Sequence, residues 1–75
     1  MRLSTLKTDS GYKPDAELKR FAVYLNGQQE TMCEVADEEH GYIIRVMRVW
    51  DKFARRAVVR RSPKIFGKVE IREHT

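Results

Sequence analysis

YIIRVMRV, residues 42–49, is rich in β-branched residues and too short and dense for an isolated helix. These residue types favour a β-strand. The run begins with Tyr42, Ile43 and Ile44 and is therefore apolar on both faces at its start. This pattern is typical of a central strand that packs on one side and meets a partner or the N-terminal residues on the other. We predict that the rest of the fold is arranged around this strand.

Two turn signals precede the strand and predict antiparallel neighbours. Residues 36–41, ADEEHG, are polar and end in glycine, which favours a hairpin into residues 42–49. Asn26-Gly27 is the dipeptide preferred in type I′ turns, because both central residues accept a positive φ. It predicts a hairpin of residues 20–25 and 28–36, although residues 18–25 also place apolar side chains at helical spacing.

The first residues of the chain give weaker structural signals. Residues 15–19 are predicted to form a short helical turn after Pro14. Residues 1–13 lack sustained apolar periodicity. We predict that they form an extended or disordered N-terminal arm.

Residues 50–61 admit two interpretations. Apolar residues at positions 50, 53, 54, 57 and 58 have the spacing of a helix. Ala57-Val58-Val59 is compatible with a short strand that follows a loop at residues 51–55. Ser62-Pro63 ends either element. Residues 65–73 then predict a last strand, with a bulge or close strand contact at Gly67.

These elements predict a mainly β fold, a small antiparallel sheet or partly open barrel of about 4–5 strands. The fold becomes α+β with one helix if residues 50–61 are helical. A chain of 75 residues allows one domain, which we place at residues 14–75 behind the arm. A domain of this size buries only about 60% of its unfolded surface, so a deep substrate cleft would consume much of its core. We therefore expect no enzyme.

The sequence predicts a soluble, unexported protein. No apolar run approaches the ~18 residues of a membrane span, and the N-terminus lacks the apolar stretch of a signal peptide. The single cysteine, Cys33, cannot form an internal disulfide, which fits a reducing compartment. We interpret Cys33 as a core or interface residue, because no neighbouring group marks a reactive thiolate.

No residue pattern indicates catalysis, a metal site or a cofactor. The chain has two histidines and no glycine-rich loop that would hold a phosphate. His40 follows three acidic residues, but zinc and calcium sites need more ligands at set spacings. We interpret this segment as a hydrated turn, and we expect no small-molecule substrate.

The two halves of the chain differ in charge. Residues 1–41 carry five basic and eight acidic side chains, whereas residues 42–75 carry ten basic and three acidic ones. This asymmetry indicates a polyanion or an acidic protein as a partner, although a basic run is also the ordinary composition of a solvated face. The predicted binding residues for nucleic acid or an acidic partner are Arg45, Arg48, Lys52, Arg55, Arg56, Arg60, Arg61 and Lys64.

Three aromatic residues, Tyr42, Trp50 and Phe53, are interleaved with these basic residues. Proteins that bind single-stranded nucleic acid combine basic grooves with stacking aromatics in this way. In so small a domain Trp50 and Phe53 are needed as core, because each large aromatic buries about 150–250 Å². We therefore predict that only the basic side chains are free to bind, through phosphates if the partner is nucleic acid.

Three segments, VYLNG at 23–27, ADEE at 36–39 followed by GYI at 41–43, and GKVEI at 67–71, resemble short uncharacterised bacteriophage and prophage proteins. The resemblance covers roughly residues 20–72. It implies a compact, mainly β domain that accompanies virion assembly or host takeover, in the bacterial host cytoplasm or in the virion. Residues 52–61 depart from the resemblance, which would place a more acidic, glycine-containing loop there.

Two functions follow. The first is a non-enzymatic phage or prophage protein that acts through protein contacts, as a virion component, an assembly factor or a host-protein inhibitor, with a protein partner or as a homo-oligomer. The second is a basic accessory or regulatory protein that binds nucleic acid through segment 45–64. A helix at residues 50–61 would favour the second function, and a strand there the first. Neither function involves a membrane.

Overall fold

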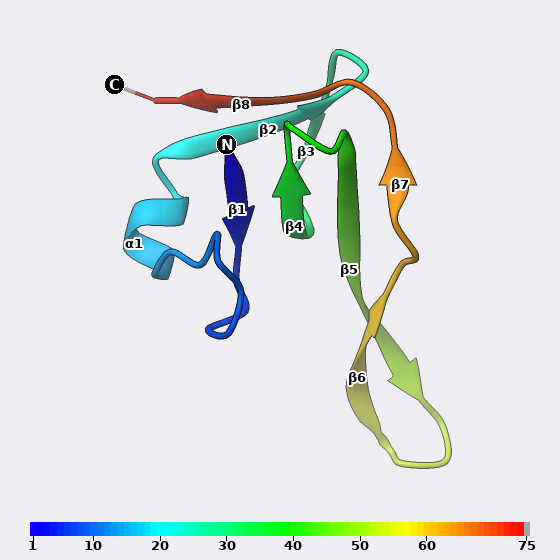
Figure 1. The fold of residues 1–75 in the computed structure, drawn as a ribbon. Helices are drawn as coiled ribbons and strands as arrows, with labels where there is room; N and C mark the ends of the chain where they lie inside the picture. The colour runs from blue at the N-terminus through cyan, green and yellow to red at the C-terminus, as the bar shows by residue number, and fades with distance from the viewer. Residues whose placement is uncertain (75) are drawn as a thin grey trace.

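The computed structural model describes residues 1–74 as two small β-sheets and one helical turn, α1 (Asp15–Leu18) (Figure 1). The first sheet has the order β1 (Arg2–Ser4), β4 (Cys33–Asp37), β5 (Tyr42–Asp51), β6 (Arg56–Arg61), and β7 (Ile65–Phe66) also pairs with β5. The second sheet has the order β3 (Gln28–Glu30), β2 (Phe21–Leu25), β8 (Val69–Glu73). All the paired strands are antiparallel. The mainly β prediction is confirmed.

The first sheet is organised around β5. The first half of β5 pairs with β4 on one edge and with β7 on the other, whereas its second half, from Val46, pairs with β6. The prediction of a central strand at residues 42–49 is confirmed. The hairpin turn before it is also confirmed, since Gly41 has a φ of 67° and donates its N–H to the Asp37 carbonyl at 3.0 Å.

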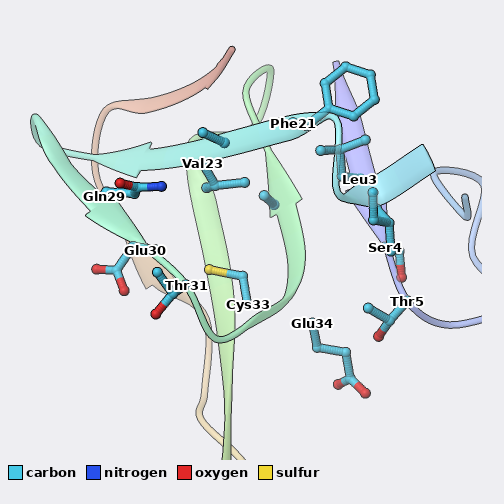
Figure 2. Close-up of a pocket in the computed structure, with 13 residues that line it drawn as sticks. Leu3, Ser4, Thr5, Phe21, Val23, Gln29, Glu30, Thr31, Cys33 and Glu34 are labelled. Carbon is cyan, nitrogen blue, oxygen red and sulfur yellow. The ribbon is translucent and has the colours of Figure 1, made fainter. Parts of the chain in front are cut away.

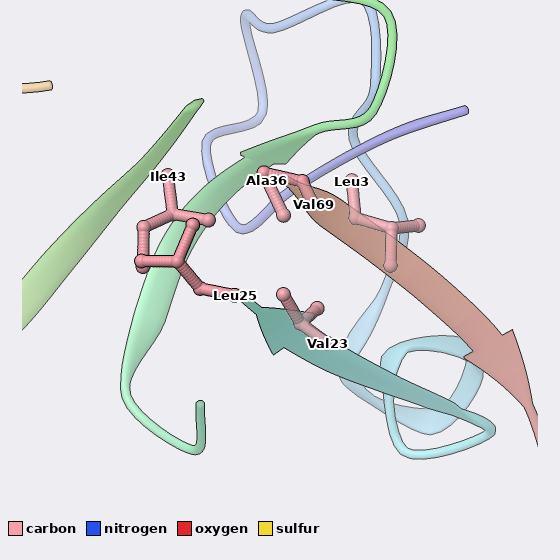
Figure 3. Packing of buried hydrophobic residues seen from close by; sticks show 6 residues of the cluster. All are labelled: Leu3, Val23, Leu25, Ala36, Ile43 and Val69. Carbon is pink, nitrogen blue, oxygen red and sulfur yellow. The ribbon is translucent and has the colours of Figure 1, made fainter. Parts of the chain in front are cut away.

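The hydrophobic core lies where the two sheets face each other (Figure 3). It consists of Leu3, Val23, Leu25, Ala36, Ile43 and Val69. Ile43 of β5 is 0% exposed. Burial of such aliphatic side chains stabilises the fold by about 25 cal/mol per Å² of apolar surface. The core therefore depends on residues from both ends of the chain.

Residues 1–13, predicted as an arm, begin with a strand of the first sheet. Leu3 pairs with Ala36 of β4, and Leu3 is 5% exposed. The Arg2 guanidinium donates to both carboxylate oxygens of Asp9 at 2.8 Å, to Asp37 at 2.8 Å and to the Tyr42 hydroxyl at 2.6 Å. The sheet thus begins at residue 2, and not at residue 14.

The hairpin predicted around Asn26-Gly27 is only partly right. The turn itself is confirmed, with φ angles of 52° and 85°, and it joins β2 to β3. The strand predicted over residues 28–36 is wrong, because the chain bends at residues 31–32. This bend places β3 in the second sheet and β4 in the first. The last predicted strand, 65–73, is divided in the same way into β7 and β8.

The helical interpretation of residues 50–61 is wrong, and the α+β alternative with it. Asp51 Oδ1 accepts hydrogen bonds from the backbone N–H groups of Phe53 and Ala54 at 2.9 and 3.1 Å, and Arg55 has a φ of 52°. Such side-chain to backbone bonds stabilise a turn in competition with a helix. Val49 and Val58 then pair across the strands. We call residues 46–61 the ribbon and the other described residues the body.

The helical turn predicted at residues 15–19 is confirmed as α1, in which Leu18 donates its N–H to the Pro14 carbonyl at 3.0 Å. Among the described residues, no helix has the length and apolar character needed to cross a membrane.

Candidate interaction surface

The ribbon projects from the body as a two-stranded hairpin (Figure 1). The whole molecule measures 41 × 26 × 22 Å. No third strand of the described chain pairs with the ribbon beyond Val46. A hairpin without such cover is only marginally stable in water. A contact with another molecule would therefore stabilise the ribbon more than the body.

Both faces of the ribbon carry apolar side chains. Side chains of residues paired across two strands lie on the same face, so the register assigns each residue to a face. One face presents Arg48, Trp50, Ala57 and Val59. The opposite face presents Met47, Val49, Val58 and Arg60. In each set apolar side chains lie next to an arginine.

Trp50 and Phe53 are not part of the core, so the prediction that the core needs them is wrong. Trp50 is 66% exposed and Phe53 is fully exposed. The two short sheets fill their interface with aliphatic side chains, and β5 leaves the body before it reaches Trp50. The sequence did carry a signal for this outcome. Residues 46–51 and 56–61 are apolar on both faces, and no other apolar segment remains to cover them.

The eight predicted binding residues divide into two groups. The first group is tied to the body. Arg45 donates to both carboxylate oxygens of Glu30, at 2.5 and 3.1 Å, and Arg61 donates to Glu34. These carboxylates raise the pKa of both guanidinium groups. Lys64 lies over the Tyr42 ring, with Nζ 4.6 Å from the centroid.

The second group forms the charged part of the ribbon. It consists of Arg48, Lys52, Arg55, Arg56 and Arg60. All five are exposed, and within residues 1–74 none of them forms an ion pair. Like charges on one projecting element create a positive potential that attracts an anionic partner over about a Debye length.

The remaining candidate groups show no reactive arrangement. Cys33 is half-buried at the start of β4, and burial, followed by the charge of Glu30, raises its pKa to about 11. Its thiol is therefore protonated at neutral pH. His40 Nδ1 lies 2.9 Å from Asp37 Oδ2, and the same oxygen accepts a hydrogen bond from the Arg2 guanidinium. Across residues 1–74 no three His, Cys, Asp or Glu side chains gather where they would hold a metal.

The structure thus defines a small, mainly β protein with a projecting basic and aromatic ribbon. In comparisons with known proteins, no protein family, curated protein or solved structure matches this chain.

Proposed function

We propose that this chain is a non-enzymatic interaction protein that binds another protein through the ribbon. The observation that carries the proposal is the exposure of Trp50, Phe53, Met47 and Val59 on one projecting element. Trp50 and Val59 lie on one face of the ribbon and Met47 on the other, and exposed apolar patches are typical of protein-binding surfaces. Aromatic residues and arginine are enriched at the centres of such surfaces, where they contribute most of the binding energy.

The backbone of the ribbon supports the same function. Beyond Val46 the outer edges of β5 and β6 have no strand partner among the described residues. An unpaired edge offers N–H and C=O groups to which another chain adds a strand. The strand at residues 56–61 is also the conformation that we expected for a protein-binding function.

The resemblance to bacteriophage and prophage proteins adds a biological setting to this proposal. In that setting the chain serves as a virion component, an assembly factor or an inhibitor of a host protein. It acts in the bacterial host cytoplasm or in the virion. A small interaction module without enzymatic activity fits each of these roles.

A second candidate function is favoured by the five ribbon cations that form no ion pair among the described side chains. β-ribbons are known to enter the grooves of DNA, and arginine and lysine contact its phosphates. In this alternative the ribbon binds the nucleic-acid backbone. Binding would then weaken steeply with salt, with a slope in log affinity of about −0.9 per neutralised phosphate for duplex DNA.

The test compares matched variants of the full chain as affinity baits in extracts of infected cells. Trp50→Ser/Phe53→Ser removes the ribbon aromatics, and Met32→Ser removes an exposed apolar side chain of the body. We expect wild type and Met32→Ser to retain a protein that the ribbon variant loses. Retention of the same proteins by all three baits would exclude the ribbon as the binding surface.

A parallel measurement addresses the second candidate. Fluorescence anisotropy with short single-stranded and duplex DNA is recorded across a salt series. The protein-binding proposal expects no binding near physiological salt. Tight binding with a steep salt slope, lost in Arg55→Glu/Arg56→Glu, would replace it with the nucleic-acid function.

A further inference from the structure

The outer edge of β6 carries backbone groups that face away from the ribbon. Ser62 donates its N–H to the Arg45 carbonyl at 2.9 Å, which fixes the hydrogen-bonded positions of the hairpin. In an antiparallel pair these positions alternate with positions whose N–H and C=O groups point away from the partner strand. In this register the backbone groups of Ala57 and Val59 point away from β5, and no other strand of the described chain pairs with them. The edge is therefore open to an added strand.

The side chains along this edge combine positive charge with apolar surface. Arg56, Val58 and Arg60 lie on one face of β6, and Ala57 and Val59 lie on the other. Both arginines are exposed, and Val59 is 52% exposed. Among the described side chains neither arginine forms an ion pair. A strand that pairs here would meet a cation at each end and apolar side chains between them.

The free edge of β5 is a poorer match for a charged partner. Val46 already donates its N–H to the Met32 carbonyl at 2.8 Å, so the body occupies the start of this edge. Beyond Val46 the strand carries Arg48 and Asp51, which have opposite charges. The edge of β6 is thus the one with charge of a single sign.

The carboxylates of the body are engaged within the chain. Glu30 and Glu34 line a cleft of about 310 Å³ that residues of both sheets form (Figure 2). Their ion pairs with Arg45 and Arg61 leave no net charge there for another cation. Three further carboxylates form ion pairs with arginines of the body, those of Asp9, Asp37 and Glu70. The matching negative charge for β6 is therefore best supplied by a different molecule.

A second copy of the ribbon does not supply that charge. Antiparallel pairing of two β6 strands about Val58 would place Arg56 of each copy opposite Arg60 of the other. Like charges directly opposite each other destabilise a pair of strands. The same positions stabilise a strand that carries carboxylates.

We propose that an acidic, extended segment of the partner protein adds a strand to the outer edge of β6. This inference rests on the proposed function and names the chemistry of the partner. We take the segment as antiparallel to β6, because antiparallel pairing is the more stable arrangement per residue. Acidic side chains then lie opposite Arg56 and Arg60, and apolar side chains lie opposite residues 57–59. The partner segment reads acidic, apolar, apolar, apolar, acidic.

A polypeptide uses features of this edge that nucleic acid leaves unused. An added strand satisfies both the N–H and the C=O groups of Ala57 and Val59. Phosphate oxygens accept hydrogen bonds and donate none, so the two carbonyls would stay without a partner. The exposed side chain of Val59 also gains from an apolar neighbour on the added strand. These observations favour an acidic protein segment over a phosphate backbone.

The probe is the fluorescein-labelled peptide Ser-Thr-Glu-Val-Val-Val-Glu-Thr-Ser, and fluorescence anisotropy follows its binding to the full chain at physiological salt. Replacement of both glutamates by glutamine should weaken binding about tenfold, because it removes two cross-strand pairs of opposite charge. N-methylation of the first and third valines should abolish binding, since their N–H groups face β6 in the antiparallel register. N-methylation of the central valine, whose N–H faces away, is the matched control and should leave binding unchanged.

Variants of the full chain test the same contact from the other side. Arg56→Glu/Arg60→Glu should lose the acidic peptide and bind the peptide that has lysines in place of both glutamates. Lys7→Glu/Lys19→Glu makes the same change of net charge at exposed positions of the body and should bind the acidic peptide within about twofold of wild type. Circular dichroism and the urea midpoint verify that both variants fold. Arg60→Glu alone replaces the double variant if that variant is unfolded.

Several results would overturn the inference. The parent and glutamine peptides could bind equally well, or Arg56→Glu/Arg60→Glu could bind the acidic peptide as wild type does. Binding of duplex DNA in place of the peptide would assign the arginines to phosphates. A dimer in light scattering that Arg56→Glu/Arg60→Glu dissociates would assign the edge to a second copy.

The bait experiment separates this inference from the proposed function. If the peptide does not bind but the wild-type bait retains a protein that Trp50→Ser/Phe53→Ser loses, the acidic strand is wrong and the proposed function stands. If the peptide does not bind and all the baits retain the same proteins, both are wrong. We expect Arg56→Glu/Arg60→Glu to lose the same protein as the aromatic variant, and Lys7→Glu/Lys19→Glu to retain it.

Discussion

The body and the ribbon are both built from short antiparallel strands, yet the body buries its apolar side chains and the ribbon exposes them. In the body the second sheet covers the first, and Ile43 of β5 is 0% exposed. Seven residues further along the same strand, Trp50 is 66% exposed. A single strand thus supplies both core and exposed surface. The difference shows that strand propensity decides local conformation, whereas tertiary cover decides which residues stabilise the fold.

The largest expected difference between body and ribbon comes from removing apolar side chains. Ile43→Ala should lower the free energy of unfolding by about 2–5 kcal/mol, because it leaves a cavity between the sheets. Val59→Ala in the ribbon, at a 52% exposed position, should change it by no more than about 0.5 kcal/mol. Urea unfolding followed by circular dichroism measures both. Equal effects would mean that the ribbon is part of the cooperative core.

The second difference concerns added volume. A Cβ at Gly67 would lie 2.8 Å from the side chains of Asn26 and Leu25, which leaves it no room. Gly67→Ala should therefore destabilise the body by about 1–3 kcal/mol through overpacking. Ala57→Val in the exposed ribbon is the matched control and should be neutral. If Gly67→Ala also proves neutral in urea unfolding, the side chains of Asn26 and Leu25 can move away from Gly67 without loss of stability.

The third difference concerns acid. The hydrogen bonds from Arg2 lower the pKa of Asp9 to about 2, from an ordinary value of 3.8, and the pKa of Asp37 is also lowered, first by the His40 N–H and then by Arg2. A carboxyl whose folded pKa is depressed stabilises the protein above its unfolded pKa. This stability is lost as the pH falls from about 4 to 2.

Asp9→Asn tests this acid dependence. The variant should be less stable than wild type by about 1 kcal/mol at pH 7, because the pair is partly exposed to solvent. The difference should shrink as the pH falls through the window given above. Urea midpoints between pH 7 and pH 2 record it. A constant difference over that range would show that the contribution of the Arg2–Asp9 pair to stability does not depend on the charge of Asp9.

Two features of the body were predictable from the sequence, since their signals are local. Asn26-Gly27 requires positive φ at two positions, and residues 42–49 allow only a strand. The break at residues 31–32 was not predictable, because Cys33 and Val35 continue an apolar pattern that pairing with β1 and β5 reassigns to another sheet. The two-sided apolar pattern of residues 46–51 and 56–61 indicates that some apolar side chains stay exposed. Which ones are exposed depends on where β5 leaves the body, and tertiary pairing sets that point.

The smallest expected effect on global stability comes from the ribbon turn. Asp51→Ala removes the acceptor for the N–H groups of Phe53 and Ala54, and loss of such a hydrogen bond costs about 0.5–1.5 kcal/mol locally. We expect the cost to be confined to the ribbon, with an unchanged urea midpoint for the body. The readout is trypsin cleavage at Lys52, Arg55 and Arg56, which should be faster than in wild type.

A control for this experiment is Asp9→Ala, which should lower the urea midpoint and leave early ribbon cleavage unchanged. Regions with few buried contacts open without global unfolding, and trypsin reports that opening. Equal cleavage rates for wild type and Asp51→Ala would mean that the hydrogen bonds accepted by Asp51 do not hold the ribbon turn closed.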